Sequence, residues 1–211
     1  MVVALAEACA ANLGEDVDYA RAAAFYLDVG KLHQPEYFTE NQGEYNLHDE
    51  LTPELSADII RSHTQDGYEL IRANHLPQFL ADVALQHHGT MPIRYFYAKA
   101  LKMTDGELRG LLLSGPKPDK NCAIIMIADA SEAVVRAMQK RTPEEVEKAI
   151  RAIIEERMDL EQFSDCDITM ADLTTIRRTL VSTLTGVYHH RVKYPSIKYK
   201  HADGKTTGEN Q

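Results

Sequence analysis

Apolar residues recur at helical spacing over most of this chain. The pattern is clearest in two segments, 143–158 and 169–187, where apolar residues fall three or four positions apart on a single face. No segment alternates apolar and polar residues in the way that a half-buried strand does. The pattern therefore predicts an all-α fold, a helical bundle of about seven to eight helices.

Residues that favour the beginning or the end of a helix divide the first half of the chain into helices. Gly14 closes a first helix, and a second helix is expected to end at Gly30. Thr52, followed by a proline, forms an N-cap and first-turn pair, and Gly67 is expected to bend or interrupt the helix that begins there. Pro77 opens another helix, which ends at the sequence QHHG.

The second half of the chain contains further helices. A short helix over 95–101 and a long one over 121–138 are predicted. Thr142 and Glu145 form a capping box that opens the next helix, and Thr169 opens the last.

Polar segments separate these helices. Residues 34–51 are too many for a tight connection, and a loop of that size often lies over a functional site. Residues 104–120, with three glycines and two prolines, are expected to form a loop. We interpret residues 1–195 as one domain and residues 196–211 as a polar, disordered tail.

Composition restricts the class of function and the compartment. Lys and Arg number 23 against 32 acids, and the formal net charge of −9 argues against nonspecific binding to long nucleic acid. A small phosphate ligand remains possible, because it needs only a few local cations or a metal ion. Three cysteines without C-x-x-C spacing favour a reducing, cytoplasmic compartment. No apolar run approaches the roughly 20 residues that span a bilayer.

Several polar side chains are candidates for chemistry. His87 and His88 stand together at a predicted helix end, where the two rings could either converge on a metal ion or form a polar helix terminus. Asp129 follows the apolar run AIIMIA, so its carboxylate must be paired, hydrogen-bonded or bound to a metal. His63 and Asp28 are weaker candidates individually. Together, these residues on different helices are what a bundle needs for a mixed imidazole and carboxylate metal centre.

The order of the motifs resembles a known family. LDVGK at 27–31, SH at 62–63, QHHGT at 86–90 and IADASEAVVR at 127–136 occur in the order found in HD-domain phosphohydrolases. The longer stretches ENQGEYNLHDELTPELSADIIRSHTQDGYELIR and LTGVYHHRVKYP are similar to the cytoplasmic HD domain of seven-transmembrane HD proteins, the PgpH-type cyclic di-AMP phosphodiesterases. The resemblance covers about residues 5–195.

The resemblance implies a metal-dependent phosphodiesterase that opens cyclic di-AMP to the linear dinucleotide. Such proteins hold two divalent ions, commonly iron or manganese, with zinc or nickel as further options, and use metal-bound hydroxide to attack phosphorus. Carried over by motif, Asp28 would bridge both ions, and His63, His87 and His88 would complete the ligands of one of them. Asp129 would belong to the other ion.

The resemblance also implies roles in binding the substrate. Lys31 and Arg136 would face the phosphate, and Lys31 would act with the two aspartates in catalysis. His48 and Asn41 lie on the loop that could cover the nucleotide. By the same resemblance, this chain would be the cytoplasmic domain of a membrane-anchored bacterial protein, attached to the membrane only through an N-terminal region that it lacks.

Leu27 departs from the family pattern, which has His immediately before the aspartate. The first His of the family also falls just upstream of VVALAEA, at about the position of Met1. Of the four ligands expected for the first ion, Asp28 and Asp129 remain, whereas the second ion keeps its full set. Two functions therefore stay open: a phosphodiesterase with impaired activity, or a catalytically degenerate module that binds nucleotide or metal and signals without turnover.

Overall fold

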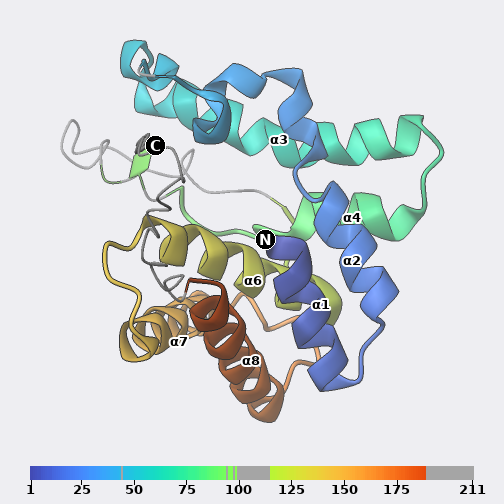
Figure 1. Cartoon of the computed structure of the whole chain (residues 1–211). Helices are drawn as coiled ribbons and strands as arrows, with labels where there is room; N and C mark the ends of the chain where they lie inside the picture. Colours follow the sequence, from blue (N-terminus) through green and yellow to red (C-terminus); the bar gives the residue numbers. More distant parts are fainter. Residues whose placement is uncertain (44, 94, 97, 99–114, 189–211) are drawn as a thin grey trace, which may run out of the picture.

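Helices make up most of the computed structural model, which describes residues 1–43, 45–93, 95–96, 98 and 115–188. Within these ranges the chain forms seven α-helices and no β-strand, so the predicted all-α fold is confirmed (Figure 1). The helices are α1 (Val2–Leu13), α2 (Val17–Tyr26), α3 (Pro53–Ala73), α4 (Gln78–Gln86), α6 (Lys120–Ala137), α7 (Pro143–Asp159) and α8 (Met170–Tyr188). The tail 196–211 and most of the segments 95–101 and 104–120 lie outside the described residues.

The helices pack around two neighbouring apolar cores. The first core lies between α1, α6, α7 and α8, which gather in the lower half of Figure 1, and includes Leu5, Ile124, Ile150, Ile176 and Leu180. The second core lies between α1, α2, α3, α4 and α6 and includes Ala23, Ile71, Leu80, Val83 and Ile125. Because α1 and α6 contribute to both cores, they join the two groups of helices into one body.

The predicted apolar faces of α7 and α8 are buried along most of their length. Met158 and Val187 are exceptions, since both are exposed although they continue the periodic pattern. Each lies in the last turn of its helix. Periodicity alone therefore overestimates how far the buried face extends.

Helix boundaries follow the capping signals in the sequence. The Thr52 hydroxyl accepts a hydrogen bond from the Leu55 backbone N–H, and Thr142 accepts one from Glu145. Gly14 ends α1 in the left-handed conformation, with φ of 75°, which glycine adopts without a steric penalty.

Gly30 and Gly67 do not end or interrupt helices, contrary to the expectation from sequence. α2 ends earlier, at Tyr26, and Gly30 lies inside a short 3₁₀ helix, η1 (Val29–His33), while α3 continues through Gly67. A Cβ on Gly30 would overlap the carbonyl oxygen of His63 and the backbone nitrogen of Gly67. The two glycines therefore allow η1 to pack directly against α3, which places Asp28 beside His63.

The polar segment 34–51 lies beside this contact, as its length and composition suggested. It contains three 3₁₀ helices, η2 (Pro35–Tyr37), η3 (Thr39–Asn41) and η4 (Leu47–Glu50). The Phe38 ring is buried and meets the His63 ring edge to face, with centroids 5.6 Å apart. Through Phe38, the segment covers one side of the His63 ring.

Candidate metal centre

Asp28 and three histidines converge from separate parts of the chain. Each of Asp28, His63, His87 and His88 offers one ligand atom, and these atoms all lie within 4.8 Å of one another. Asp28 Oδ1 is 3.6 Å from Nε2 of His63 and 3.6 Å from Nε2 of His87. The two Nε2 atoms are 3.4 Å apart. The structure thus brings together four of the five residues proposed from sequence as metal ligands, and we call them the histidine cluster.

Backbone carbonyls fix the orientation of two of the rings. His87 Nδ1 donates to the carbonyl oxygen of Ala84 at 2.9 Å, and His63 Nδ1 donates to that of Ile60. A carbonyl oxygen can only accept, so in the neutral imidazole the proton is on Nδ1 and the lone pair is on Nε2. Both lone pairs therefore face the cluster, which is the arrangement that metal-binding histidines commonly show.

Burial favours the neutral form of His63 and His88, and the Asp28 carboxylate is charged. Burial, reinforced by the adjacent His87, lowers the pKa of His63 to about 4. The same two causes, in the same order, hold the pKa of His88 well below its ordinary value. Burial tends to raise the pKa of Asp28, but His87 and Lys31 beside it outweigh that effect and hold the pKa below its usual range. The cluster thus combines one carboxylate with imidazoles, of which His63 and His88 favour the neutral form, and such a set is suited to a divalent cation.

One atom of the histidine cluster lacks a partner that a cation would supply. Asp28 Oδ1 is buried and receives no hydrogen bond. A buried carboxylate oxygen without a donor or cation is costly, because it has lost its hydration. Two ligand atoms that are each about 2.0–2.2 Å from one ion lie roughly 3–4 Å apart, and the separations of 3.4 and 3.6 Å agree with that. The residues present therefore fit one metal ion.

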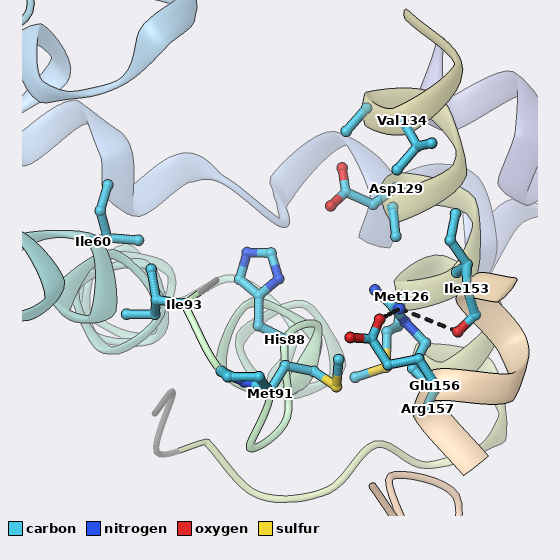
Figure 2. A pocket seen from close by; sticks show the side chains of 13 residues that line it. Ile60, His88, Met91, Ile93, Met126, Asp129, Val134, Ile153, Glu156 and Arg157 are labelled. Atoms are coloured by element: carbon cyan, nitrogen blue, oxygen red, sulfur yellow. Dashed lines mark hydrogen bonds and ion pairs between the residues drawn. The ribbon is translucent and has the colours of Figure 1, made fainter. Parts of the chain in front are cut away.

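Asp129 lies outside the tight cluster but faces the same space. It lines a cavity of about 300 Å³ together with Asp28, Lys31, His88 and Arg136, which we call the polar cavity. Figure 2 shows Asp129 on α6 and His88 on the turn after α4 pointing toward one another. Asp129 is half-buried at the cavity wall, whereas the sequence suggested a position within the core. Burial raises its pKa, although His87 and Lys31 act in the opposite direction.

Leu27 packs away from the polar groups. It is 4% exposed and belongs to the second apolar core, next to residues of α1, α2, α4 and α6. A leucine side chain has no atom that can bind a metal. The residue before Asp28 therefore contributes to stability and supplies no ligand.

Two cations line the polar cavity, and both contact carboxylates. Lys31 Nζ lies 2.9 Å from Asp28 Oδ2 and 2.8 Å from Glu40 Oε1. Arg136, two helical turns after Asp129, is 61% exposed in its side chain and lies 3.8 Å from Glu132. Both predicted phosphate-binding residues therefore reach the cavity that contains Asp28.

The two loop residues proposed to bind substrate lie elsewhere. His48 is buried, and its Nε2 is 2.9 Å from the carbonyl oxygen of Tyr37. It lines a neighbouring aromatic cavity that also contains Lys31. Asn41 is exposed, and its side-chain amide donates to the carbonyl oxygen of Pro35. Neither residue lines the polar cavity.

Sequence reasoning missed Gln162, which supports the cluster from the turn that follows α7. Gln162 is buried, and its Oε1 accepts a hydrogen bond of 2.9 Å from the backbone N–H of Thr90. Its Nε2 donates to the Thr90 hydroxyl at 2.9 Å and to the Leu160 carbonyl at 2.7 Å. Gly89, with φ of 53°, lies so close that a Cβ there would overlap Gln162 Oε1. Gln162 thus fixes the turn that carries His87 and His88, and nothing in the local sequence indicates this.

The chain belongs to the HD-domain family, whose model matches residues 1–134. HD domains are metal-dependent, in agreement with the histidine cluster. The cyclic-di-AMP phosphodiesterase PgpH of Listeria monocytogenes is 48% identical over 202 residues, and that of Bacillus subtilis is 44% identical over 206. These matches cover 94% and 95% of this chain but only 28% and 29% of the relatives, so the chain spans less than a third of their length.

Solved structures agree with this assignment. The crystal structure of the L. monocytogenes phosphodiesterase PgpH HD domain is 47% identical, with a TM-score of 0.85 and 90% of each chain covered. The same domain in complex with cyclic di-AMP is 47% identical, with a TM-score of 0.86 and 89% of each chain covered. The resemblance inferred from the motifs is confirmed. No helix in the described ranges is long and apolar enough to cross a membrane.

Proposed function

We propose that this chain is a metal-dependent phosphodiesterase domain that hydrolyses cyclic di-AMP to the linear dinucleotide. The observation that carries the proposal is the histidine cluster, in which three imidazoles surround a carboxylate oxygen that has no donor. The choice of substrate is supported by the similarity to an HD domain that was crystallised with cyclic di-AMP. The proposal includes a cytoplasmic location, supported by three free cysteines that fit a reducing compartment.

The histidine cluster and the charged residues of the polar cavity have different roles. Asp28, His63, His87 and His88 would hold the divalent ion, for which iron or manganese is our first choice because mixed imidazole and carboxylate sites suit these metals, with zinc or nickel as alternatives. When bound, the ion neutralises phosphate charge and lowers the pKa of bound water.

The charged residues around the cluster act on the substrate and on the attacking water. Lys31 Nζ and the Arg136 guanidinium bind the non-bridging phosphate oxygens. Asp129 orients the attacking water and takes up its proton while the bond from phosphorus to the 3′ oxygen breaks. The 3′ oxygen leaves as a hydroxyl after taking a proton from solvent.

Leu27 favours a second candidate function. The residue before Asp28 belongs to the apolar core and supplies no ligand. Fewer metal ligands are therefore present near Asp129 than in the histidine cluster. Such a chain could bind the nucleotide through its single complete metal position and its two cations without turning it over. That alternative is a binding module that signals by occupancy.

Turnover and binding must be measured separately to decide between the two functions. The purified chain, supplied with manganese or iron, is incubated with cyclic di-AMP, and the linear dinucleotide is quantified by chromatography. Affinity is measured by calorimetry on the same preparation. Hydrolysis that His87→Ala abolishes supports the enzyme, whereas tight binding without product supports the binding module. An absence of both binding and product contradicts the proposed substrate.

A further inference from the structure

One buried histidine folds the segment 34–51 back on itself. His48 is 4% exposed, and its Nε2 donates a hydrogen bond of 2.9 Å to the carbonyl oxygen of Tyr37, which lies 11 positions earlier in the chain. The backbone N–H of His48 donates to the side chain of Asn46. The imidazole also contacts two aromatic rings, with its centroid 5.4 Å from that of Tyr37 and 5.0 Å from that of Phe96. His48 therefore ties the end of the segment to its beginning.

The residue that follows this hydrogen-bonded carbonyl, Phe38, touches the histidine cluster. Its buried ring meets the His63 ring edge to face, with centroids 5.6 Å apart. The Lys31 Nζ lies 5.1 Å from the centroid of the same ring, within the range of a cation–π contact. Two residues later, Glu40 Oε1 lies 2.8 Å from that ammonium group. The position of Phe38 therefore affects both a proposed metal ligand and the cation beside the cluster.

The contacts of the segment 34–51 are of two kinds. Its backbone hydrogen bonds join residues of the segment itself, three positions apart. The ion pair of Glu40 with Lys31 and the ring contacts of Phe38 and His48 connect it to the rest of the molecule. A segment whose backbone hydrogen bonds are local can open without unfolding the helices that it covers. Side chains rather than backbone therefore keep it closed over the cluster.

We propose that His48 is a positioning residue of the metal centre: it holds Phe38 over His63 and so slows the exchange of a bound ion with solvent. The proposal rests on the metal position of the proposed function and adds a residue that controls access to it. The sequence suggested that His48 binds substrate, but His48 lies outside the histidine cluster and does not line the polar cavity. It can act on the ion only through the residues between them, and the carbonyl of Tyr37 is the first of these.

Four substitutions test the proposal. His48→Ala removes the donor to the Tyr37 carbonyl. His48→Gln keeps a donor, because the glutamine amide nitrogen reaches roughly the position of the imidazole Nε2. Phe38→Ala removes the ring that covers His63. His33→Ala is the matched control, at an exposed histidine of η1 that lies outside the cluster.

The rate of metal release is the main measurement. Each chain is loaded with manganese and mixed with an excess of chelator, and the free ion is followed with time. Removing a group that supports a metal ligand costs about 10–100-fold in affinity, so His48→Ala should release the ion about tenfold faster than the native chain. His48→Gln and His33→Ala should release it at close to the native rate. The absorption spectrum of the cobalt-loaded chain should be the same in all of them, because every ligand is retained.

The double variant, His48→Ala with Phe38→Ala, shows whether His48 acts through Phe38. It should release the ion no faster than Phe38→Ala alone, because the contact that His48 maintains is then already lost. Two accelerations that add would indicate general destabilisation and overturn the proposal, as would release from His48→Ala at the native rate.

The test also separates this proposal from the proposed function. A native chain that retains no manganese contradicts the metal position and, with it, the role of His48. A native chain that retains manganese but shows no difference between the variants overturns the role of His48 alone. Cyclic di-AMP is not added, so the outcome does not depend on turnover.

Discussion

The histidine cluster and the α6 wall of the polar cavity differ in how firmly their side chains are held. In the histidine cluster, His63 and His87 have their rings oriented by backbone carbonyls, and Asp28 Oδ1 lies within 3.6 Å of both. Along α6, Asp129 is half-buried and Arg136 is mostly exposed, and neither belongs to the tight group of ligand atoms. Pre-oriented ligands give a metal site its affinity, because little rearrangement is needed on binding. The histidine cluster therefore has ligand atoms in place for an ion, whereas Asp129 and Arg136 on α6 belong to no such group.

The difference has a local cause in the chain. Asp28 follows Leu27, whose side chain packs with the helices of the second core. Two successive residues therefore lie in different environments: Leu27 in the apolar core and Asp28 in the histidine cluster. A chain built this way should hold one ion per molecule tightly.

The largest effect is expected for His87→Ala. The substitution removes a buried imidazole that lies beside Asp28 Oδ1, and the remaining ligands cannot close the gap. Loss of residues that merely orient a ligand costs about 10–100-fold in metal affinity, so loss of a ligand should exceed 100-fold. Elemental analysis after dialysis should find about one manganese or iron ion per native chain and almost none in the variant. His33→Ala, at an exposed histidine outside the cluster, is the control. Full metal content in His87→Ala would show that the ion binds elsewhere.

Leu27→His should change both stability and metal content. Burying an imidazole in place of a leucine in the second core should cost about 1–3 kcal/mol in the free energy of unfolding of the metal-free chain. If the imidazole reaches Asp28 and Asp129, the variant should bind more than one ion per chain, and metal should restore part of the lost stability. Denaturant unfolding with and without manganese, together with elemental analysis, measures both effects. A variant that loses stability and gains no metal would show that a side chain at this position cannot supply a ligand on the Asp129 side of the polar cavity.

The sequence predicts the members of the histidine cluster better than the residues that hold them in position. His87 and His88 adjoin the glycine at the end of α4, so local signals place them, and motif order assigns His63 and Asp28 to the same centre. Gly30, in contrast, looks like a helix stop, because a close approach to another backbone leaves no mark in the neighbouring residues.

Contacts between distant segments of the chain are equally hard to predict from sequence. Gln162 bonds to Thr90 across 72 positions of the chain, and the Lys31 contact with Glu40 depends on how the segment 34–51 folds back over η1. Periodicity and capping report on neighbours in the chain, whereas these contacts are set by packing between elements. Ligands could therefore be predicted, and the residues that hold them in place could not.

Gln162→Leu should produce a smaller loss in metal affinity, of about tenfold. The leucine keeps the approximate volume but leaves the Thr90 backbone N–H without its acceptor, so the turn that carries His88 loses its fixed position. Gln162→Glu retains an acceptor oxygen for the same N–H and should recover most of the affinity. Gln139→Leu, at an exposed position, controls for the added apolar surface. Metal titration by calorimetry gives the affinities, and thermal unfolding of the metal-free chains shows how much of any loss is general destabilisation. Equal affinities for native chain and Gln162→Leu would mean that the turn is held by other contacts.

The smallest effect is expected for Glu40→Gln, which tests phosphate binding in the polar cavity. Glu40 Oε1 lies 2.8 Å from Lys31 Nζ, so the lysine charge is shared between two carboxylates when no phosphate is present. Glutamine removes one of those negative charges from the polar cavity and leaves the ammonium freer to bind a phosphate oxygen. Partly exposed ion pairs are worth about 0.2–1 kcal/mol, which sets the expected gain in inorganic phosphate affinity at up to about fivefold. The gain should shrink as salt is added, because the interaction is screened. Glu36→Gln, at an exposed acid in the same segment, should show no gain. Weaker phosphate binding by Glu40→Gln would mean that Glu40 holds Lys31 in its binding position rather than competing with the ligand for it.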